Sequence, residues 1–372
     1  MGEVMPANDT KYSALLRTLK ADILGGRYDL EKPFPSERAL ISRFKLSRNT
    51  VQHVLHSLIA AGLLTSRRGA GYFVTKAAVS RQIGILIPRK GYSEFFQPVI
   101  GEISRLAQKN GYSLLFGEMP PRGPEGRARA TIRLARDMVK QGVAGVIFQP
   151  NEGVGDAETI NRTVASIFRD AGVELVLCDY DIVTPPARSE FDVVGSNNVE
   201  AGMRLAEHLI ACGARHILFV LPPNAATSHV NRCRGAMALA TSLRGECRCE
   251  AFEAAPDDVT AFRKRLRRNR PDAIIGCNDK CAAELLRTLG KLKIRVPDDV
   301  MLAGFDDISI ASLTIPSLTT IHQPCAKIAR AAFGRLLARM RNPELDPMKI
   351  TLDAPLVVRE STMRAKEKRT KK

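Results

Sequence analysis

Five polar side chains with the chemistry to read DNA bases stand close together near the amino terminus. Ser47, Arg48, Asn49, Thr50 and Gln52 would occupy the first turn of a helix that begins after a short turn. Arginine can pair with a guanine edge in the major groove, and asparagine or glutamine can pair with an adenine edge. The spacing of these residues therefore predicts a base-reading helix.

The elements that must position these side chains are three helices and a hairpin. Apolar residues recur at helical spacing in residues 12–26, 36–44 and 48–61. Ser36 and Ser47 are suitable N-caps for the second and third helices. Residues 63–66 and 72–75 are predicted strands. A pair of short helices joined by a tight turn, followed by such a hairpin, predicts a winged helix-turn-helix.

The tip of the predicted wing is basic and rich in glycine. Arg67 and Arg68 suit contacts with phosphates or with the minor groove. Gly69 and Gly71 flank this tip, and a bulky side chain there would prevent close approach of the backbone to DNA. The wing is therefore a second predicted DNA contact.

The charge of the chain is unevenly distributed. The 372 residues carry a net charge of +17, of which +6 lies in residues 1–80 and +5 in residues 359–372. A basic surplus at the two ends of the chain points to nucleic acid as a partner. The long middle, residues 81–358, is nearly balanced, so we expect that it needs no polyanion as a partner. The last residues, 363–372, are predicted to be a solvated, disordered tail.

The middle of the chain alternates short apolar runs with helical patterns. Runs such as QIGILIP, VAGVIFQ, HILFVLP and DVMLAGFDD predict parallel strands covered by helices on both faces. The pattern starts twice, which predicts an α/β fold with two similar Rossmann-like lobes of four or five strands each. Neither a G-x-G-x-x-G fingerprint nor a P-loop follows any of these strands, so no nucleotide cofactor is expected.

Polar and aromatic residues follow several of these predicted strands. Ligands of such sheets bind beyond the carboxyl ends of the strands, and carboxylates, an amide, an arginine and aromatic rings suit a hydroxylated small molecule. An aspartate in this position can equally cap a helix, and a tyrosine can simply pack. The candidates are Tyr92, Phe95, Phe96, Asp179, Tyr180, Arg232, Asn278, Asp279, Asp306 and Asp307.

The sequence does not predict catalysis, a metal site or a membrane span. Asp306 and Asp307 are adjacent and should point in different directions, and no orienting partner is evident for the six histidines. The cysteine spacings at Cys247 and Cys249 and at Cys277 and Cys281 lack the second pair that zinc needs. Apolar runs are at most about 8 residues long. The amino terminus lacks a secretory signal, so a cytoplasmic protein is expected.

The amino-terminal module resembles a known family. The stretch PSERALISRFKLSRNTVQHVLHSLIAAGLLTSRRGAGYFV is similar to GntR-type winged helices, with likeness running from Tyr12 to Val74. The resemblance implies that Arg38 binds the DNA backbone, that Arg48 and Thr50 lie at the groove, and that Arg68 and Gly69 form the wing tip. Gln52 stands where this family usually has an arginine.

The middle resembles the effector domain of LacI/GalR repressors, which is similar to periplasmic sugar-binding proteins. The motifs are ND before a helix, GFDD, P-x-LTT and a closing R-x-S, in that order across residues 82–362. The resemblance implies two α/β lobes with a ligand in the cleft between them. It places ligand contacts on residues that the strand ends also indicate, namely Phe95 or Phe96, Asp179, Arg232, Asn278 and Asp306.

Together these modules resemble the arrangement of the arabinose-repressor group. We expect a winged helix-turn-helix at residues 9–76, a linker at 77–81 and an effector and dimerisation domain at 82–362. The expected function is a bacterial transcriptional regulator, a repressor, that binds a palindromic double-stranded operator as a homodimer under control of a sugar-like effector. It would be associated with the nucleoid when bound to DNA. The alternative is a soluble carbohydrate-binding protein with no DNA role.

Overall fold

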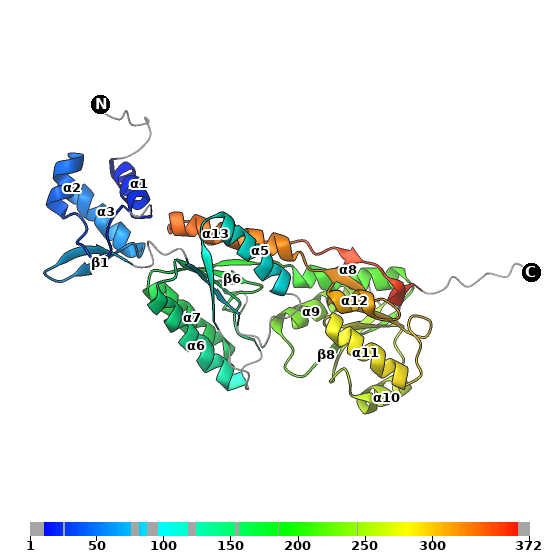
Figure 1. Cartoon of the computed structure of the whole chain (residues 1–372). Coiled ribbons are helices and arrows are strands. Elements are labelled where there is room, and N and C mark those ends of the chain that lie inside the picture. The colour runs from blue at the N-terminus through cyan, green and yellow to red at the C-terminus, as the bar shows by residue number, and fades with distance from the viewer. Residues whose placement is uncertain are drawn as a thin grey trace, which may run out of the picture. The chain divides into compact units, whose positions relative to one another are not determined.

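The computed structural model of the protein describes residues 11–24, 27–75, 82–87, 96–117, 124–152, 156–184, 186–243 and 245–363 (Figure 1). The chain divides into two units. The first comprises residues 1–90, 102–193 and 330–349, and the second comprises residues 91–101, 194–329 and 350–372. The predicted linker at 77–81 and residues 364–372 of the predicted tail lie outside the described residues, so these boundaries stay predictions.

The amino-terminal module, which we call the head, has three helices and a two-stranded hairpin. Its elements are α1 (Lys11–Leu24), α2 (Glu37–Phe44), α3 (Arg48–Ala60), β1 (Leu64–Arg67) and β2 (Gly71–Val74). The strands pair antiparallel, with Arg67 opposite Gly71. The winged helix-turn-helix is therefore present, with β1 one residue later and β2 one residue earlier than predicted.

Local capping and a shared core explain why these helices form. The Ser36 hydroxyl accepts a hydrogen bond from the Ala39 N–H at 3.3 Å, and the Ser47 hydroxyl accepts one from the Thr50 N–H at 3.2 Å. Both predicted N-caps are confirmed. The apolar faces of the helices and the hairpin form one core, made of Leu15, Leu19, Ile23, Phe34, Leu40, Val51, Val54, Leu55, Leu58, Leu63, Leu64 and Val74.

A six-stranded sheet in the order β13-β7-β6-β5-β3-β4 lies mainly in the first unit, while residues 194–196 of β7 and 350–352 of β13 belong to the second. Its strands are β3 (Gln82–Leu86), β4 (Ser113–Phe116), β5 (Gly145–Phe148), β6 (Glu174–Cys178), β7 (Asp192–Ser196) and β13 (Lys349–Leu352). The pairs β3–β4, β3–β5 and β5–β6 are parallel. The helices of this part are α5 (Phe96–Lys109), α6 (Pro124–Gln141), α7 (Ala157–Asp170) and α13 (Cys325–Arg341). Phe148 and Phe168 are fully buried in its core.

The second unit carries another six-stranded sheet, in the order β14-β12-β11-β10-β8-β9. Its strands are β8 (His216–Leu221), β9 (Arg248–Glu253), β10 (Ala273–Gly276), β11 (Met301–Asp306), β12 (Thr319–His322) and β14 (Leu356–Val357). Its helices are α8 (Asn198–Ala211), α9 (Thr227–Ser242), α10 (Val259–Arg268), α11 (Asp279–Lys291), α12 (Ser309–Leu313) and the 3-10 helix η1 (Glu360–Thr362). All pairs are parallel except β12–β14.

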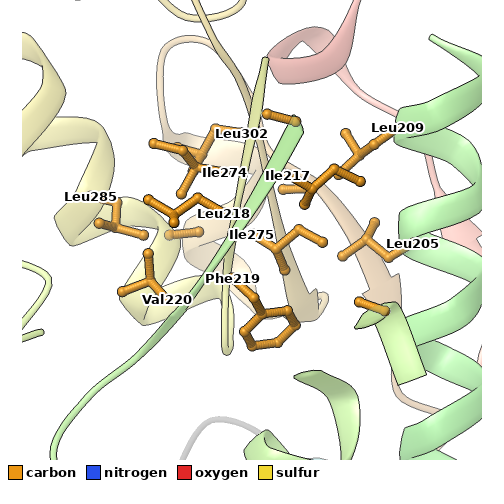
Figure 2. Close-up of a cluster of buried hydrophobic side chains, with 14 of the residues drawn as sticks. Leu205, Leu209, Ile217, Leu218, Phe219, Val220, Ile274, Ile275, Leu285 and Leu302 are labelled. Atoms are coloured by element: carbon orange, nitrogen blue, oxygen red, sulfur yellow. The ribbon is translucent and has the colours of Figure 1, made fainter. Parts of the chain in front are cut away.

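The central strands of the second unit are apolar because both of their faces are covered. Figure 2 shows Ile217 and Phe219 of β8 beside Ile274 and Ile275 of β10, with Leu205 of α8 on one side and Leu285 of α11 on the other. These side chains are fully buried. The predicted parallel sheets with helices on both faces are confirmed by this arrangement.

The prediction of four or five strands in each lobe is wrong for the described residues, because each sheet has six. The sequence pattern missed the short strands β7, β12, β13 and β14, which do not have the continuous apolar run of a central strand. In β13, exposed and half-buried residues alternate, and β14 has only two residues. Pairing with distant strands, rather than local hydrophobicity, defines these four elements.

The helices α8 and α9 approach each other closely in the second unit. A Cβ atom placed on Gly202 of α8 would lie 1.9 Å from the backbone oxygen of Arg232, and one placed on Gly235 of α9 would lie 1.9 Å from that of Val199. Only glycine allows this contact. The backbone position of Arg232 is therefore set directly by the contact between α8 and α9.

Candidate functional site

The first turn of α3 presents polar side chains outward. Arg48 and Asn49 are exposed, whereas Ser47 and Thr50 are joined by a hydroxyl–hydroxyl hydrogen bond of 2.7 Å at the helix cap. Ser47 therefore has a structural role as the N-cap. Arg48 and Asn49 are the side chains of this turn best placed to meet a base edge.

Glu37 joins three elements of the head, which the sequence interpretation missed. Its carboxylate accepts hydrogen bonds from the Gln52 amide at 3.1 Å and from the Tyr72 hydroxyl at 3.2 Å. It also lies 3.7 Å from the guanidinium of Arg48. The sequence did contain a signal for this contact, namely an acidic residue directly after the Ser36 cap and a hydrogen-bond donor, Gln52, in the next helix. Gln52 is thus held by α2 in this structure.

The wing tip has the backbone geometry that glycine favours. Gly69 and Gly71 have φ values of +76° and +93°, and a Cβ atom on either would meet nothing within 4 Å. The backbone angle alone therefore explains these glycines; close approach to DNA stays a prediction. Arg68 is exposed, and the Arg67 guanidinium lies 4.2 Å from the centre of the Phe73 ring.

Arg38 lies on α2, next to Glu37, and is exposed. Among the described residues it has no carboxylate partner within ion-pair distance. Its guanidinium is therefore available to a phosphate, as the resemblance implies. The ten predicted DNA-binding residues all belong to one small domain, on α2, α3 and the wing.

In the second unit, Arg232 of α9 is the centre of a buried polar cluster. Its guanidinium donates to Asp306, to the side chain of Asn198 and to the backbone oxygen of Cys277, each at 2.9 Å. It also lies 4.8 Å from the centre of the Phe305 ring. The structure thus brings together two predicted residues, Arg232 and Asp306, at the carboxyl end of β11. Asn198, the first residue of α8, was missed because the strand before it, β7, was missed.

Asn278 and Asp279, which follow β10, have structural partners. The Asn278 side chain caps α11 by accepting from the Cys281 N–H at 2.9 Å. Asp279 is fully buried and accepts from the Thr320 hydroxyl at 2.6 Å and the Ile308 N–H at 3.1 Å. Burial raises the pKa of Asp279 to about 8. In this structure the helix-cap alternative describes Asn278, and its contact with a ligand stays a prediction.

In the first unit, Asp179 and Tyr180 follow β6. Asp179 is half-buried with a φ of +83°, and the Tyr180 hydroxyl donates to the backbone oxygen of Pro150. Phe96, which belongs to the second unit, is the first residue of α5 and is 2% exposed, so its ring is covered in this structure. Phe95 and Tyr92 lie outside the described residues.

Two acceptors at the strand ends of the first unit were also missed. Gln149 directly follows β5, and its buried side-chain oxygen has no hydrogen-bond partner among the described residues. The same is true of one carboxylate oxygen of Asp181, whose other oxygen accepts from the Ser189 N–H at 3.2 Å. Unsatisfied buried acceptors are costly, so they mark places where a donor from a ligand would be favourable. The signal was their position after an apolar run, directly for Gln149 and three residues on for Asp181.

Two histidines do have carboxylate partners, which corrects the sequence interpretation. His322 contacts Asp307 at 2.9 Å, and His216 contacts Glu250 at 2.7 Å. Asp307 also accepts from Arg359, whereas Asp306 accepts from Arg232, so the adjacent aspartates point to different partners as predicted. No group of three or more potential metal ligands occurs among the described residues.

These features define a class of protein: a winged helix-turn-helix head followed by α/β units of the kind that hold small ligands at their strand ends. Residues 11–74 match the gntR family of bacterial regulatory proteins, and residues 206–362 match the periplasmic binding protein-like domain. The chain is a transcriptional regulator that joins these two domains.

Two curated relatives agree with this assignment. The chain is similar to an arabinose metabolism transcriptional repressor of Geobacillus stearothermophilus, with 25% identity over 95% of this chain and 97% of the relative. It is also 26% identical to the HTH-type transcriptional repressor PurR of Vibrio campbellii over 76% of this chain and 82% of that protein. Because both relatives are transcriptional repressors, the expectation of a regulator rather than an enzyme is confirmed.

Solved structures show the same fold. A transcriptional regulator CelR–cellobiose complex aligns with a TM-score of 0.64 at 21% identity, covering 85% of this chain and 92% of that one. A LacI family transcriptional regulator from Enterococcus faecalis with bound ribose aligns with a TM-score of 0.62 at 22% identity, covering 77% and 100%. In the described part of the chain, none of the helices has the length and apolar character needed to cross a bilayer.

Proposed function

We propose that the protein is a repressor that binds a palindromic operator as a homodimer in the bacterial cytoplasm. The observation that carries the proposal is the outward first turn of α3, where Arg48 and Asn49 are exposed in a domain that matches a DNA-binding regulatory family. The base contacts would come from these two side chains with Thr50 and Gln52, and phosphate contacts from Arg38, Ser47 and the wing tip at Arg67, Arg68, Gly69 and Gly71.

Selection of operator sequences tests this part of the proposal. Full-length protein incubated with a random duplex library should enrich an inverted repeat, because two identical heads related by a twofold axis read the same half-site. Enrichment of a single unrepeated half-site would contradict the dimer, and no enrichment at all would contradict sequence-specific binding.

Two exposed apolar side chains support the homodimer. Leu313 at the end of α12 is 76% exposed and Ile315 is 92% exposed, in the second unit. The two lie two residues apart in the chain, and adjacent exposed apolar side chains can form part of a protein interface. Sedimentation velocity should give a dimer for the natural chain and a shift to monomer for Ile315→Asp. A monomer for the natural chain at micromolar concentration would contradict this interface.

The proposed effector is a sugar or a sugar derivative. Gln149 and Asp181 offer buried acceptors without partners, and Arg232 with Asp306 offers a charged pair at a strand end. Hydroxyl groups donate and accept hydrogen bonds, so they suit both the unpartnered acceptors and the charged pair. The similar structures with bound cellobiose and ribose favour the same ligand class. Phe95, Phe96, Asp179, Tyr180 and Asn278 are the other proposed contacts.

A thermal-shift screen of sugars and related metabolites tests the effector proposal. A ligand at about 100 times its Kd should add about 2.7 kcal/mol to the free energy of unfolding. Binding of the effector should then change operator affinity by a coupling free energy of about 1 to 3 kcal/mol. A sugar that stabilises the protein and leaves operator affinity unchanged would contradict the coupling.

A further inference from the structure

The helix α10 of the second unit carries a dense group of positive charges that the regulator model does not use. Five of its ten residues are arginine or lysine, and none is acidic. The stretch thus departs locally from the near balance of charge that residues 81–358 show as a whole. Figure 1 labels this helix near α11.

The packing of α10 separates one apolar face from the charged surface. Phe262 is fully buried and Leu266 is 8% exposed, and the Phe262 ring packs edge-on against Phe252 with centroids 5.3 Å apart. These anchors are four residues apart and hold the helix on the core. Arg263, Lys264, Arg267 and Arg268 lie on the opposite side of the helix and are exposed.

Four side chains form the exposed basic face of α10, which we define as Arg263, Lys264, Arg267 and Arg268. All four are exposed, and none has a carboxylate within ion-pair distance among the described residues. The nearest cation on the same helix, Arg265, is different because it is bound to Glu250. The cationic face is therefore not neutralised by the second unit.

Three acidic residues near α10 are already engaged, namely Glu250, Asp258 and Asp299. Glu250 contacts Arg248 and His216 as well as Arg265, and Asp258 caps the helix by accepting from the Thr260 and Ala261 N–H groups at 3.0 and 2.9 Å. Asp299 lies 3.6 Å from Arg270. Arg263 and Arg267, and likewise Lys264 and Arg268, repel each other at a spacing of four residues, which offsets part of the favourable interaction of the last-turn cations with the helix dipole. An external anion would relieve that repulsion.

We propose that the basic face of α10 binds the phosphate backbone of duplex DNA without sequence preference. Three of its four cations are arginines, whose planar guanidinium groups match phosphate oxygens in pairs. The four positions repeat at helical spacing along one side, so a linear polyanion can contact them together. A DNA-binding regulator brings such a polyanion to the molecule, and this second contact would add affinity for DNA outside the operator.

The test measures binding of full-length protein to a random duplex without operator, by fluorescence anisotropy at several salt concentrations. The test variant is R263A/K264A/R267A/R268A, which retains helix propensity because alanine is the best helix former. The matched control is R133A/R136A/K327A/K349A, which removes the same charge from exposed, scattered positions. Both are compared in the natural head and in a head neutralised by R38A/R48A/R67A/R68A.

The proposal expects the slope of log Kd against log salt to fall by about 2 to 4 in the α10 variant, since each lost phosphate contact contributes about 0.9. Affinity at low salt should fall about tenfold or more below the scattered control, with either head. Equal slopes for the α10 variant and the control would overturn the proposal. Poly-glutamate serves as an acidic-peptide probe of the same surface. If the α10 variant lost binding to poly-glutamate and kept its binding to DNA, the DNA proposal would be overturned and the surface assigned to an acidic peptide. Operator selection tests base reading by α3 and does not depend on α10. The proposed function and the proposed DNA contact of α10 can therefore be refuted independently of each other.

Discussion

The buried pair of Arg232 and Asp306 gives a prediction whose size follows from the structure. Their side chains are 6% and 13% exposed, and the guanidinium and carboxylate are 2.9 Å apart. Removing one partner of a buried ion pair leaves an uncompensated charge and costs about 3 to 5 kcal/mol. Arg232→Met should therefore lower the free energy of unfolding of the second unit by about 3 to 5 kcal/mol. The same change also removes the hydrogen bonds to Asn198 and Cys277.

The second variant of the cycle is Asp306→Asn. Asp306 has a φ of +106°, a conformation that asparagine tolerates better than most residues, so this change removes the charge at little backbone cost. It leaves Arg232 buried without an opposing charge, so it should also cost about 3 to 5 kcal/mol. The double variant leaves no buried charge without a partner. Its loss in free energy of unfolding should therefore be smaller than the sum of the two single losses, by about 1.5 to 3 kcal/mol.

Hydrogen exchange in increasing urea measures this coupling within the second unit. Peptides from β10 and α11 report the opening free energy near the pair, independently of the head. Refolding is checked by far-ultraviolet circular dichroism, since the chain has no tryptophan. If the two single costs add to within about 0.5 kcal/mol in the double variant, the residues do not act as a pair and the reasoning is refuted.

Three further predictions follow from other buried or strained positions. Burial raises the pKa of Asp279 from 3.8 to about 8 in the folded chain. As the pH rises, this carboxyl therefore loses its proton in the unfolded chain first. The free energy of unfolding should fall by about 1.4 kcal/mol per pH unit between pH 4 and 8. Asp279→Asn should remove that slope in urea titrations; parallel pH profiles of the two proteins would contradict it. Gly202→Ala should separate α8 from α9 and lower Tm by several degrees while weakening effector binding through Arg232, and an unchanged Tm would count against the close contact. Gly69→Ala should destabilise the head by about 1 kcal/mol from its positive φ alone, measured by exchange in β1 and β2, and no loss there would contradict the backbone argument.

The sequence predicted the features of the fold that depend on local interactions. The caps at Ser36 and Ser47 are formed by residues three positions apart, so the motif contains both partners. The central strands were predictable because continuous apolar runs are required wherever both faces of a sheet are covered. The edge strand β13 was not, since it joins β7 from far along the chain and its alternating exposure is weakly apolar.

The candidate site was predictable in its residue types and less so in its contacts. Arg232 and Asp306 were both expected, but their pairing across 74 residues, and the contribution of Asn198, depend on the packing of α8, α9 and β11. Glu37 was missed because its partners are Gln52 and Tyr72, which reach it only in the folded head. Long-range geometry is the information that motifs and periodicity do not contain.

The affinity of the full-length protein for its selected operator tests the central claim most directly. The selected duplex and a scrambled duplex are titrated with the natural chain, with Arg48→Ala and with the exposed control Arg133→Ala. We predict binding at least about a thousandfold tighter to the operator than to the scrambled duplex, and a loss of about 1 to 3 kcal/mol for Arg48→Ala alone. Equal affinities for the two duplexes, or equal effects of the two variants, would contradict DNA reading by α3.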